Sequence, residues 1–292
     1  MPKVRPRKKS TKLGLAVIAS LLLLTGCGQR ITVLNPQGPV ARQEYHLIIL
    51  SIVIMSFVLA VVMTIFIYVL VKFRARPGKD PEGYNPELAG YGKLEIIWTV
   101  VPILMMIALA VPTVKMIYRL QHPPTPTGDP MTIQVTSVDW KWIFEYPQQG
   151  IETVNYVAIP AGIPVDFKLS AVGPMNSFWV PALGGQEYAM PGMNMPLWLE
   201  ASNPGTYLGW GANFTGAGFA DMHFNVLSKS QNAFNQWVSN VKQTAPKLTE
   251  VTYRKLLQPG EVPTMTFSSM DSQFTQMNAE MSSLSQTIPG KQ

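Results

Sequence analysis

The sequence has 292 residues, 47% of them hydrophobic and only 14% charged, and it contains a single cysteine. One cysteine excludes an intrachain disulfide, even in an oxidising compartment. The formal net charge of +6 reflects 23 Lys and Arg against 17 Asp and Glu residues, but six of these cations lie in residues 1–26, which contain no acid. Without that segment the charges balance, so the composition gives no reason to expect a nucleic-acid partner.

An export signal is predicted at the N-terminus. Six cations precede an uninterrupted apolar stretch at 13–24, and small residues lie directly before Cys27. This order is typical of a secretory signal peptide, which we place at residues 1–26. The Leu-Thr-Gly-Cys sequence that ends at Cys27 resembles the lipobox of bacterial lipoproteins, which implies that Cys27 carries acyl chains in the mature protein. The alternative is a buried cysteine behind an ordinary signal peptide.

Two membrane spans are predicted next. Residues 47–71 contain no charge and would extend about 38 Å as a helix, enough to cross a hydrocarbon core of about 30 Å. The second span is placed at 96–117, uncharged as far as residue 114, with two prolines that neighbouring membrane helices can accommodate. For this second stretch the alternative is a buried helix of a soluble domain.

The charges around the spans predict their orientation. Residues 72–95 hold five cations, whereas residues 28–46 hold only Arg30 and Arg42. By the positive-inside rule the loop 72–95 is cytoplasmic. The segment 27–46 and everything after the second span are then extracytoplasmic, as the signal peptide also requires. The expected location is a bacterial cell membrane, with the chain crossing twice and held by lipid as well.

The rest of the chain is predicted to be a β-domain with a helical extension. A Pro-rich linker at 118–130 marks the boundary, because repeated prolines remove hydrogen-bond donors. Short β-branched and aromatic runs separated by turn residues follow at 131–228, as in a β-sandwich. Residues 229–292 return to helical spacing, with several apolar residues on one face of a first helix. The Ser-, Met- and Gln-rich part from 264 onward is expected to be loosely ordered.

The order of these parts resembles subunit II of the haem-copper terminal oxidases. Three motifs match in sequence: Leu-Glu-Ile-Ile-Trp-Thr-Val-Val-Pro at 94–102, Trp-Lys-Trp-Ile-Phe-Glu-Tyr at 140–146, and Ser-Phe-Trp-Val-Pro-Ala-Leu-Gly-Gly at 177–185. The similarity covers roughly 44–227, and the combination is more specific than any single motif. It implies a two-helix transmembrane hairpin, an all-β cupredoxin-like sandwich and a short α-helical C-terminal extension.

The chain departs from the cytochrome c oxidases at the positions of their two-copper centre. That family places a histidine before the Ser-Phe pair and then a loop with the pattern C-x-E-x-C-x-x-x-H-x-x-M, because soft copper requires thiolates and imidazoles. Here the corresponding residues carry none of these ligands except the thioether of Met222: they are Asn176, Gly211, Asn213, Thr215 and Phe219. We therefore expect a domain that has kept its shape and binds no metal.

Loss of the copper centre resembles the pattern of bacterial quinol oxidases, whose electron donor is dissolved in the bilayer. The resemblance implies subunit II of a respiratory quinol oxidase, which couples quinol oxidation and the reduction of oxygen to water to proton translocation. Its expected partners are subunit I, further small subunits and membrane lipid. No cofactor is expected in this chain, and haem and copper are expected in subunit I. The sequence shows no self-contained quinone pocket.

Three further residues are singled out. Glu95 lies at the cytoplasmic mouth of the second span, where the family resemblance implies the entrance of a proton pathway; the alternative is a surface acid that balances Lys93. Trp140 and Trp142 alternate, so on a strand both would point to the same face. In cytochrome-type relatives this region helps electrons enter, and packing in the sandwich or at a subunit interface is the alternative.

One alternative function comes from the methionines. Thioethers bind Cu(I), and a membrane-anchored copper carrier could use five of them: Met175, Met190, Met193, Met195 and Met222. The three histidines, His46, His122 and His223, are too scattered in the sequence for a three-histidine site. A carrier has no need of an oxidase-like span with Glu95, so the spacing of the motifs favours the oxidase subunit.

Overall fold

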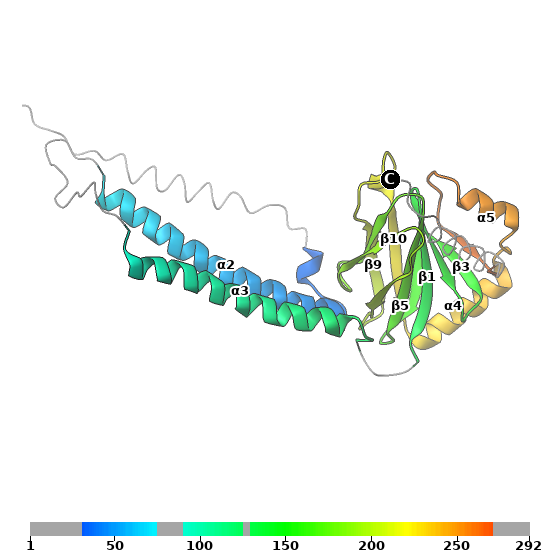
Figure 1. The fold of residues 1–292 in the computed structure, drawn as a ribbon. Coiled ribbons are helices and arrows are strands. Elements are labelled where there is room, and N and C mark those ends of the chain that lie inside the picture. The colour runs from blue at the N-terminus through cyan, green and yellow to red at the C-terminus, as the bar shows by residue number, and fades with distance from the viewer. Residues whose placement is uncertain (1–30, 75–89, 125–128, 271–292) are drawn as a thin grey trace, which may run out of the picture.

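The computed structural model describes residues 31–74, 90–124 and 129–270, which form a helical hairpin and a β-sandwich (Figure 1). Cys27 and the predicted signal peptide lie outside the described residues, as do 75–89 of the predicted cytoplasmic loop, 125–128 of the predicted linker and the tail from 271. The expected fold class, a two-helix hairpin followed by a cupredoxin-like sandwich and a short helical extension, is confirmed.

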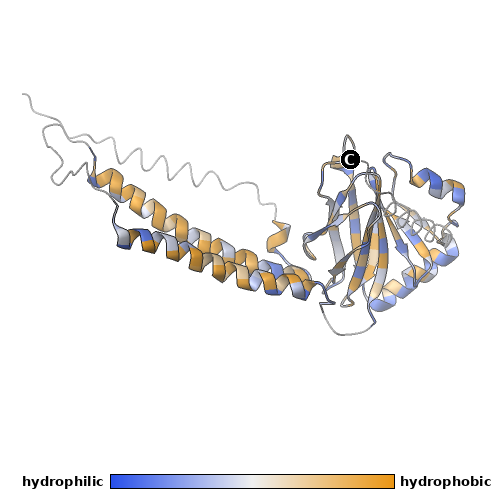
Figure 2. Cartoon of the chain, in the orientation of Figure 1, coloured by the Kyte–Doolittle hydropathy of each residue, from blue (hydrophilic) through white to orange (hydrophobic). Residues whose placement is uncertain are grey.

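Two long apolar helices, α2 (Pro39–Lys72) and α3 (Gly92–Leu120), lie side by side in the hairpin. Each is long and apolar enough to cross a membrane, and hydrophobic residues occupy most of the length of both helices (Figure 2). Pro39 occupies the first turn of α2, where its missing N–H leaves no hydrogen bond unmade.

The helices extend beyond the predicted spans. Residues 39–46, expected to precede the first span, already belong to α2, and α3 starts before residue 96 and continues to Leu120, inside the predicted linker. Pro102 and Pro112 lie within α3 without ending it. The extra turns arise because a helix continues until a breaker or a cap stops it, whereas a span prediction follows only the most hydrophobic stretch.

Two sheets pack face to face in the sandwich. The six-stranded sheet has the order β11-β3-β2-β1-β5-β8, and the five-stranded sheet has the order β4-β10-β9-β6-β7. The first sheet comprises β1 (Met131–Val138), β2 (Lys141–Tyr146), β3 (Ile151–Val154), β5 (Val165–Val172), β8 (Met195–Leu199) and β11 (Met265–Phe267). The second comprises β4 (Tyr156–Pro160), β6 (Asn176–Trp179), β7 (Gln186–Ala189), β9 (Gly205–Gly211) and β10 (His223–Lys229).

An aromatic cluster fills the space between the sheets. Trp142 and Phe144 of β2 alternate with residues that face the other way, and both contact Phe178 of β6 and Phe224 of β10. Phe178 and Phe224 stack with ring centroids 4.7 Å apart. Edge-to-face and stacked aromatic pairs add to the stabilisation that burial itself provides. The core therefore links the two sheets through side chains of three strands.

The C-terminal extension packs against the sandwich. Helix α4 (Gln231–Thr244) begins at Ser230, whose Oγ accepts a hydrogen bond from the Ala233 amide, and α5 (Glu250–Leu256) begins at Thr249 in the same way. Trp237 of α4 contacts the rings of Tyr146 and Tyr156. The expectation of loose order from residue 264 is wrong for 265–267, because β11 pairs with β3 and completes the larger sheet.

The end of the hairpin nearest the sandwich is attached directly to it. The amide of Gln37 donates to the carbonyl of Ala182 at 2.7 Å, and the amide of Ala41 donates to that of Leu183 at 3.1 Å. Gly184 faces Val40 so closely that a Cβ atom would lie 2.9 Å from Val40 Cγ1. The start of α2 and the 180–185 loop therefore fix the hairpin against the sandwich without a covalent crosslink.

Candidate functional site

Three of the six positions that the family resemblance matches to copper ligands of the cytochrome c oxidases come together at one end of the sandwich. Asn176 begins β6, Gly211 ends β9, and Met222 directly precedes β10. The amide Nδ2 of Asn176 donates to the thioether of Met222 at 2.9 Å, and Asn176 Oδ1 accepts from the amide of Ser177 at 2.8 Å. Both side chains are buried, so this end of the domain is closed by an internal contact.

Gly211 lies directly against the contact of Asn176 with Met222. A Cβ atom at Gly211 would lie 2.8 Å from Asn176 Oδ1 and 3.3 Å from Met222 Sδ. Any side chain at this position, including a cysteine, would push Asn176 away. The amide of Gly211 donates to the carbonyl of Met222 at 3.0 Å, which holds the two ends of the 211–222 loop together.

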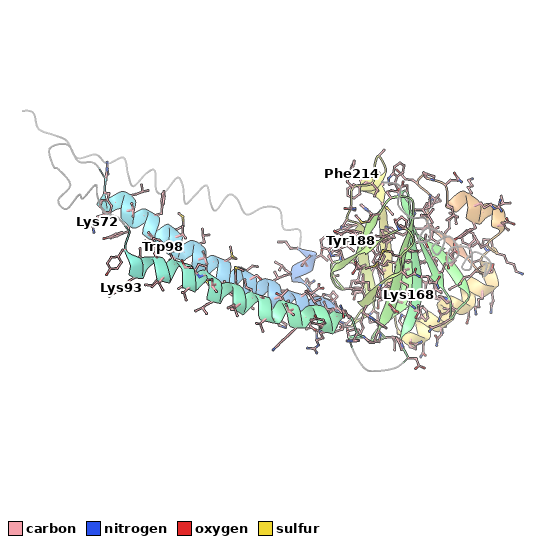
Figure 3. The ribbon with its side chains drawn as sticks, viewed as in Figure 1. Lys72, Lys93, Trp98, Lys168, Tyr188 and Phe214 are labelled. Carbon is pink, nitrogen blue, oxygen red and sulfur yellow. The ribbon has the colours of Figure 1, made fainter. Side chains whose placement is uncertain are left out.

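The other three positions lie along the 211–222 loop, where they make contacts that hold the loop in its conformation. Asn213 Nδ2 donates to the carbonyl of Met175 at 3.4 Å, and Phe219 contacts the exposed ring of Phe214 edge-on. The carbonyl of Thr215 accepts from the indole Nε1 of Trp140 at 3.3 Å. In Figure 3, Phe214 lies at the edge of the sandwich.

These residues do not fit the two-copper centre of the cytochrome-type relatives. An amide, a glycine, a hydroxyl and a phenyl ring stand where that centre requires a histidine, two thiolates and a second histidine. Within residues 31–74, 90–124 and 129–270, no group of three or more His, Cys, Asp or Glu side chains could hold a metal ion. The remaining thioether is already the acceptor of the Asn176 amide.

The two tryptophans have different environments, which corrects the expectation that they share the face of a strand. Trp142 lies in β2 and is fully buried in the core. Trp140 lies in the turn before β2 and covers the 211–222 loop, where a Cβ atom at Gly218 would lie 2.5 Å from its ring. The alternation rule fails because the strand begins only at Lys141.

Two charged residues flank Trp140. Burial raises the pKa of Asp139, and the nearby Lys141 ammonium opposes the shift. Burial also lowers the pKa of Lys141, against the influence of Asp139. Lys141 Nζ donates to the carbonyl of Gln258 at 2.6 Å, and the amide of Gly260 donates to that of Asp139 at 2.6 Å. The segment after α5 thus fastens the turn that carries Trp140.

Glu95 lies in the first turn of α3, at the end of the hairpin far from the sandwich, the end that Lys93 and Trp98 mark in Figure 3. Its side chain is exposed, and its carbonyl accepts a hydrogen bond from Thr99 Oγ1 at 2.8 Å. A carboxylate in a first turn is favoured by the helix dipole. The structure therefore keeps Glu95 away from Trp140 and the 211–222 loop.

The methionines of the alternative function occupy different kinds of position. Met222 is buried, and Met195 packs against the core. Met175 and Met193 are exposed on the surface. The one thioether contact with a polar group among these residues is that of Met222 with Asn176, in which sulfur serves as a hydrogen-bond acceptor.

The sequence reasoning missed Glu44. This residue lies in the second turn of α2, and its Oε1 accepts from the amide of Gly185 at 3.0 Å. A Cβ atom at Gly185 would lie 2.8 Å from the same oxygen, so a side chain there would displace the Glu44 carboxylate. The Gly-Gly pair at 184–185 was a signal for this close approach, but its partner lies 141 positions away.

Comparisons with known proteins give matches to both parts of the chain. The family model for the transmembrane domain of cytochrome c oxidase subunit II matches residues 36–116. The periplasmic domain of subunit II of cytochrome oxidase from Bradyrhizobium japonicum is similar over 40% of this chain and 96% of its own, with 23% identity and a TM-score of 0.39.

Two curated relatives are similar over most of their length. Quinol oxidase subunit 2 of Bacillus cereus is 49% identical over 86% of this chain and 87% of its own. The protein of the same name in Bacillus subtilis is 50% identical over 88% of this chain and 80% of its own. At this identity and coverage, the chain belongs to the quinol oxidase subunit 2 family, the second subunits of haem-copper terminal oxidases.

Proposed function

We propose that this subunit works in a membrane complex that oxidises quinol and reduces oxygen to water, with proton translocation across the membrane. The observation that carries the proposal is the contact of Asn176 with Met222 beside Gly211. A soluble cytochrome donor needs a metal port on the outer domain, whereas quinol reaches the membrane-embedded subunit through the bilayer. An outer domain closed by an amide–thioether contact suits a lipid-soluble donor.

The proposal assigns the reactive groups to partners. Subunit I would hold the haems and the copper, and this chain would hold neither. The hairpin supports a partner of this kind, because the side chains of its most apolar stretches are open to their surroundings in the isolated chain. The outer domain and the acylated Cys27 would lie on the extracytoplasmic side, and the basic segment 72–95 in the cytoplasm.

Glu95 would open a proton pathway from the cytoplasm toward the oxygen-reducing site of subunit I. Its position in the first turn of α3, exposed and far from the sandwich, supports this role. A carboxylate at the mouth of a span can exchange protons with water and pass them to a neighbouring subunit. The role needs an ionisable group at that point and involves no residue of the sandwich.

The complex itself provides the test. We expect the purified oxidase to consume oxygen with quinol, to leave reduced cytochrome c unoxidised, and to contain no more copper than subunit I accounts for. Haem spectra and elemental analysis on the same sample measure these quantities. Near-infrared absorption from a two-copper centre would overturn the proposal. A chain that purifies with copper but without haem would favour the copper carrier.

A further inference from the structure

Two acidic side chains lie next to each other on the larger sheet. Glu145 of β2 and Glu152 of β3 are directly opposite in the antiparallel register, so both point to the same face, with Cβ atoms about 5 Å apart. That face is the outer one, because Phe144 and Tyr146, which alternate with Glu145, point into the core between the sheets. Glu145 is 4% exposed and Glu152 is 1% exposed. Two acids are therefore buried side by side outside the core.

The C-terminal extension covers this face. Ile143 and Val154, two residues along each strand from the acids, share their face. Both pack against buried side chains of the extension: Leu248, Tyr253, Leu256 and Phe267. Phe267 of β11 is also directly opposite Glu152 in the β11–β3 pair, and α4 and α5 lie on the β3 side of the sandwich (Figure 1). The acid pair thus lies on the face that the extension closes.

One oxygen of the pair lacks a hydrogen bond. Oε1 of Glu152 is buried and has no donor within reach among the described residues. An ionised carboxylate in this position would have lost its hydration without compensation, whereas a protonated carboxyl group loses much less. Burial, and then the charge of Glu145, raise the pKa of Glu152 well above its usual value. The folded domain therefore favours the protonated form of Glu152.

The other charged groups near this face are directed elsewhere. Lys141 of β2 shares the face of Glu145, but its Nζ donates to the carbonyls of Asp139 and Gln258. Strands β1 and β11 contribute no titratable side chain, and α5 contributes the buried Tyr253. The charged side chains of the extension are exposed: Lys242, Lys247, Glu250, Arg254, Lys255 and Glu261. A proton is therefore the ligand that neutralises Glu152 without drawing a further side chain under the extension.

We propose that Glu145 and Glu152 hold one proton in the folded domain, and that loss of this proton to water releases the C-terminal extension from the larger sheet. The ionised pair would place two like charges side by side under apolar side chains, and opening of the extension lets both carboxylates reach water. The aromatic core lies on the opposite face of the sheet, so it can stay packed while the extension opens. The pair would make the extension sensitive to the pH around the outer domain, whatever substrate the complex oxidises.

Hydrogen–deuterium exchange of the full chain in detergent, followed by mass spectrometry, tests the proposal. Exchange rates are measured from mildly acidic to mildly alkaline pH and divided by the intrinsic rate at each pH. Opening releases one proton between the usual and the raised pKa of Glu152. Protection of residues 231–267 should therefore fall by up to about ten-fold per pH unit in that window and then level off, while β1 and β5 keep their protection.

Three variants complete the experiment. Glu152→Gln should abolish the pH response, and Glu145→Gln should reduce it, because it removes the neighbouring charge. Glu250→Gln is the matched control, since Glu250 is an exposed acid of the same extension, and it should respond like wild type. Equal responses of wild type and Glu152→Gln would overturn the proposal, as would a loss of protection that spreads equally to β1 and β5. Protection restored by added Ca²⁺ at high pH would also overturn it, because the pair would then be a cation site.

Discussion

The sandwich buries its large apolar side chains, whereas the hairpin leaves most of its apolar side chains exposed in the isolated chain. In the sandwich, Phe178 is completely buried, whereas Phe57 of α2 is 58% exposed in the isolated chain. The sandwich thus gains its stability from contacts within the chain, while the hairpin needs lipid or partner helices to cover it. A substitution in the sandwich core should therefore affect the folding of the chain, and a substitution on the hairpin surface should affect its assembly.

The largest expected effect would break the sandwich core. Phe178→Ala removes a ring that contacts Trp142, Phe144 and Phe224, and we expect it to lower the free energy of unfolding of the sandwich by about 3–5 kcal/mol. Denaturant titration of the full chain in detergent, followed by tryptophan fluorescence, measures the change. Phe57→Ala is the matched control and should leave this transition in place. Equal losses for both variants would contradict the contrast between the regions.

The next effect concerns a buried acid on the outer face of the larger sheet. Burial, and then repulsion from Glu145, which is opposite Glu152 in the β2–β3 pair, raise the pKa of Glu152 well above its usual value. The folded state therefore holds its proton to higher pH than the unfolded state, so stability falls as pH rises between the two pKa values. Each pH unit in that window costs about 1.4 kcal/mol.

Glu152→Gln should remove this pH dependence, since the amide does not titrate. We expect the difference in unfolding midpoint between the variant and wild type to grow in favour of the variant as the pH is raised through the window. Thermal unfolding of both proteins at a series of pH values checks the sign. A constant difference at all pH values would mean that Glu152 titrates normally in the fold.

The third prediction concerns the hairpin, where function is expected to change without a change in folding. Glu95→Ala in the assembled oxidase should slow turnover roughly ten-fold at unchanged haem content, because proton entrance needs an ionisable group. Glu95→Asp should retain part of the rate. Lys93→Ala removes a neighbouring charge and is the control. The measurement is oxygen consumption by wild type and each variant at saturating quinol and equal haem. Equal rates in all variants would mean that Glu95 is only a surface charge.

The smallest expected effects concern the two helices of the C-terminal extension, α4 and α5. Ser230→Ala removes the cap of α4 and should cost about 1 kcal/mol of unfolding free energy. Arg254→Ala breaks the exposed ion pair with Glu250 and should cost less than about 0.5 kcal/mol. The same denaturant titration compares the two. A larger loss for Arg254→Ala would mean that the surface of α5 carries the attachment of the extension.

Several features followed from local sequence pattern alone. An uncharged apolar stretch predicts a helix that can span a membrane whatever surrounds it, and short β-branched runs between turns predict strands of a sandwich. The absence of copper ligands followed from the resemblance to cytochrome c oxidase subunit II, because Asn176, Gly211, Thr215 and Phe219, at the matching positions, have no thiolate or imidazole. The predictions of helices and strands depend only on the chemistry of residues that are near one another in the chain.

Other features were decided by the tertiary structure. The different places of Trp140 and Trp142 depend on where the turn before β2 ends, and β11 forms because β3 offers it an open edge. The contact of Asn176 with Met222 joins residues 46 positions apart, and that of Glu44 with Gly185 joins residues 141 positions apart. Periodicity reports which face of an element is apolar, but the partner of a single polar atom is set by the packing of whole elements, which no local pattern encodes.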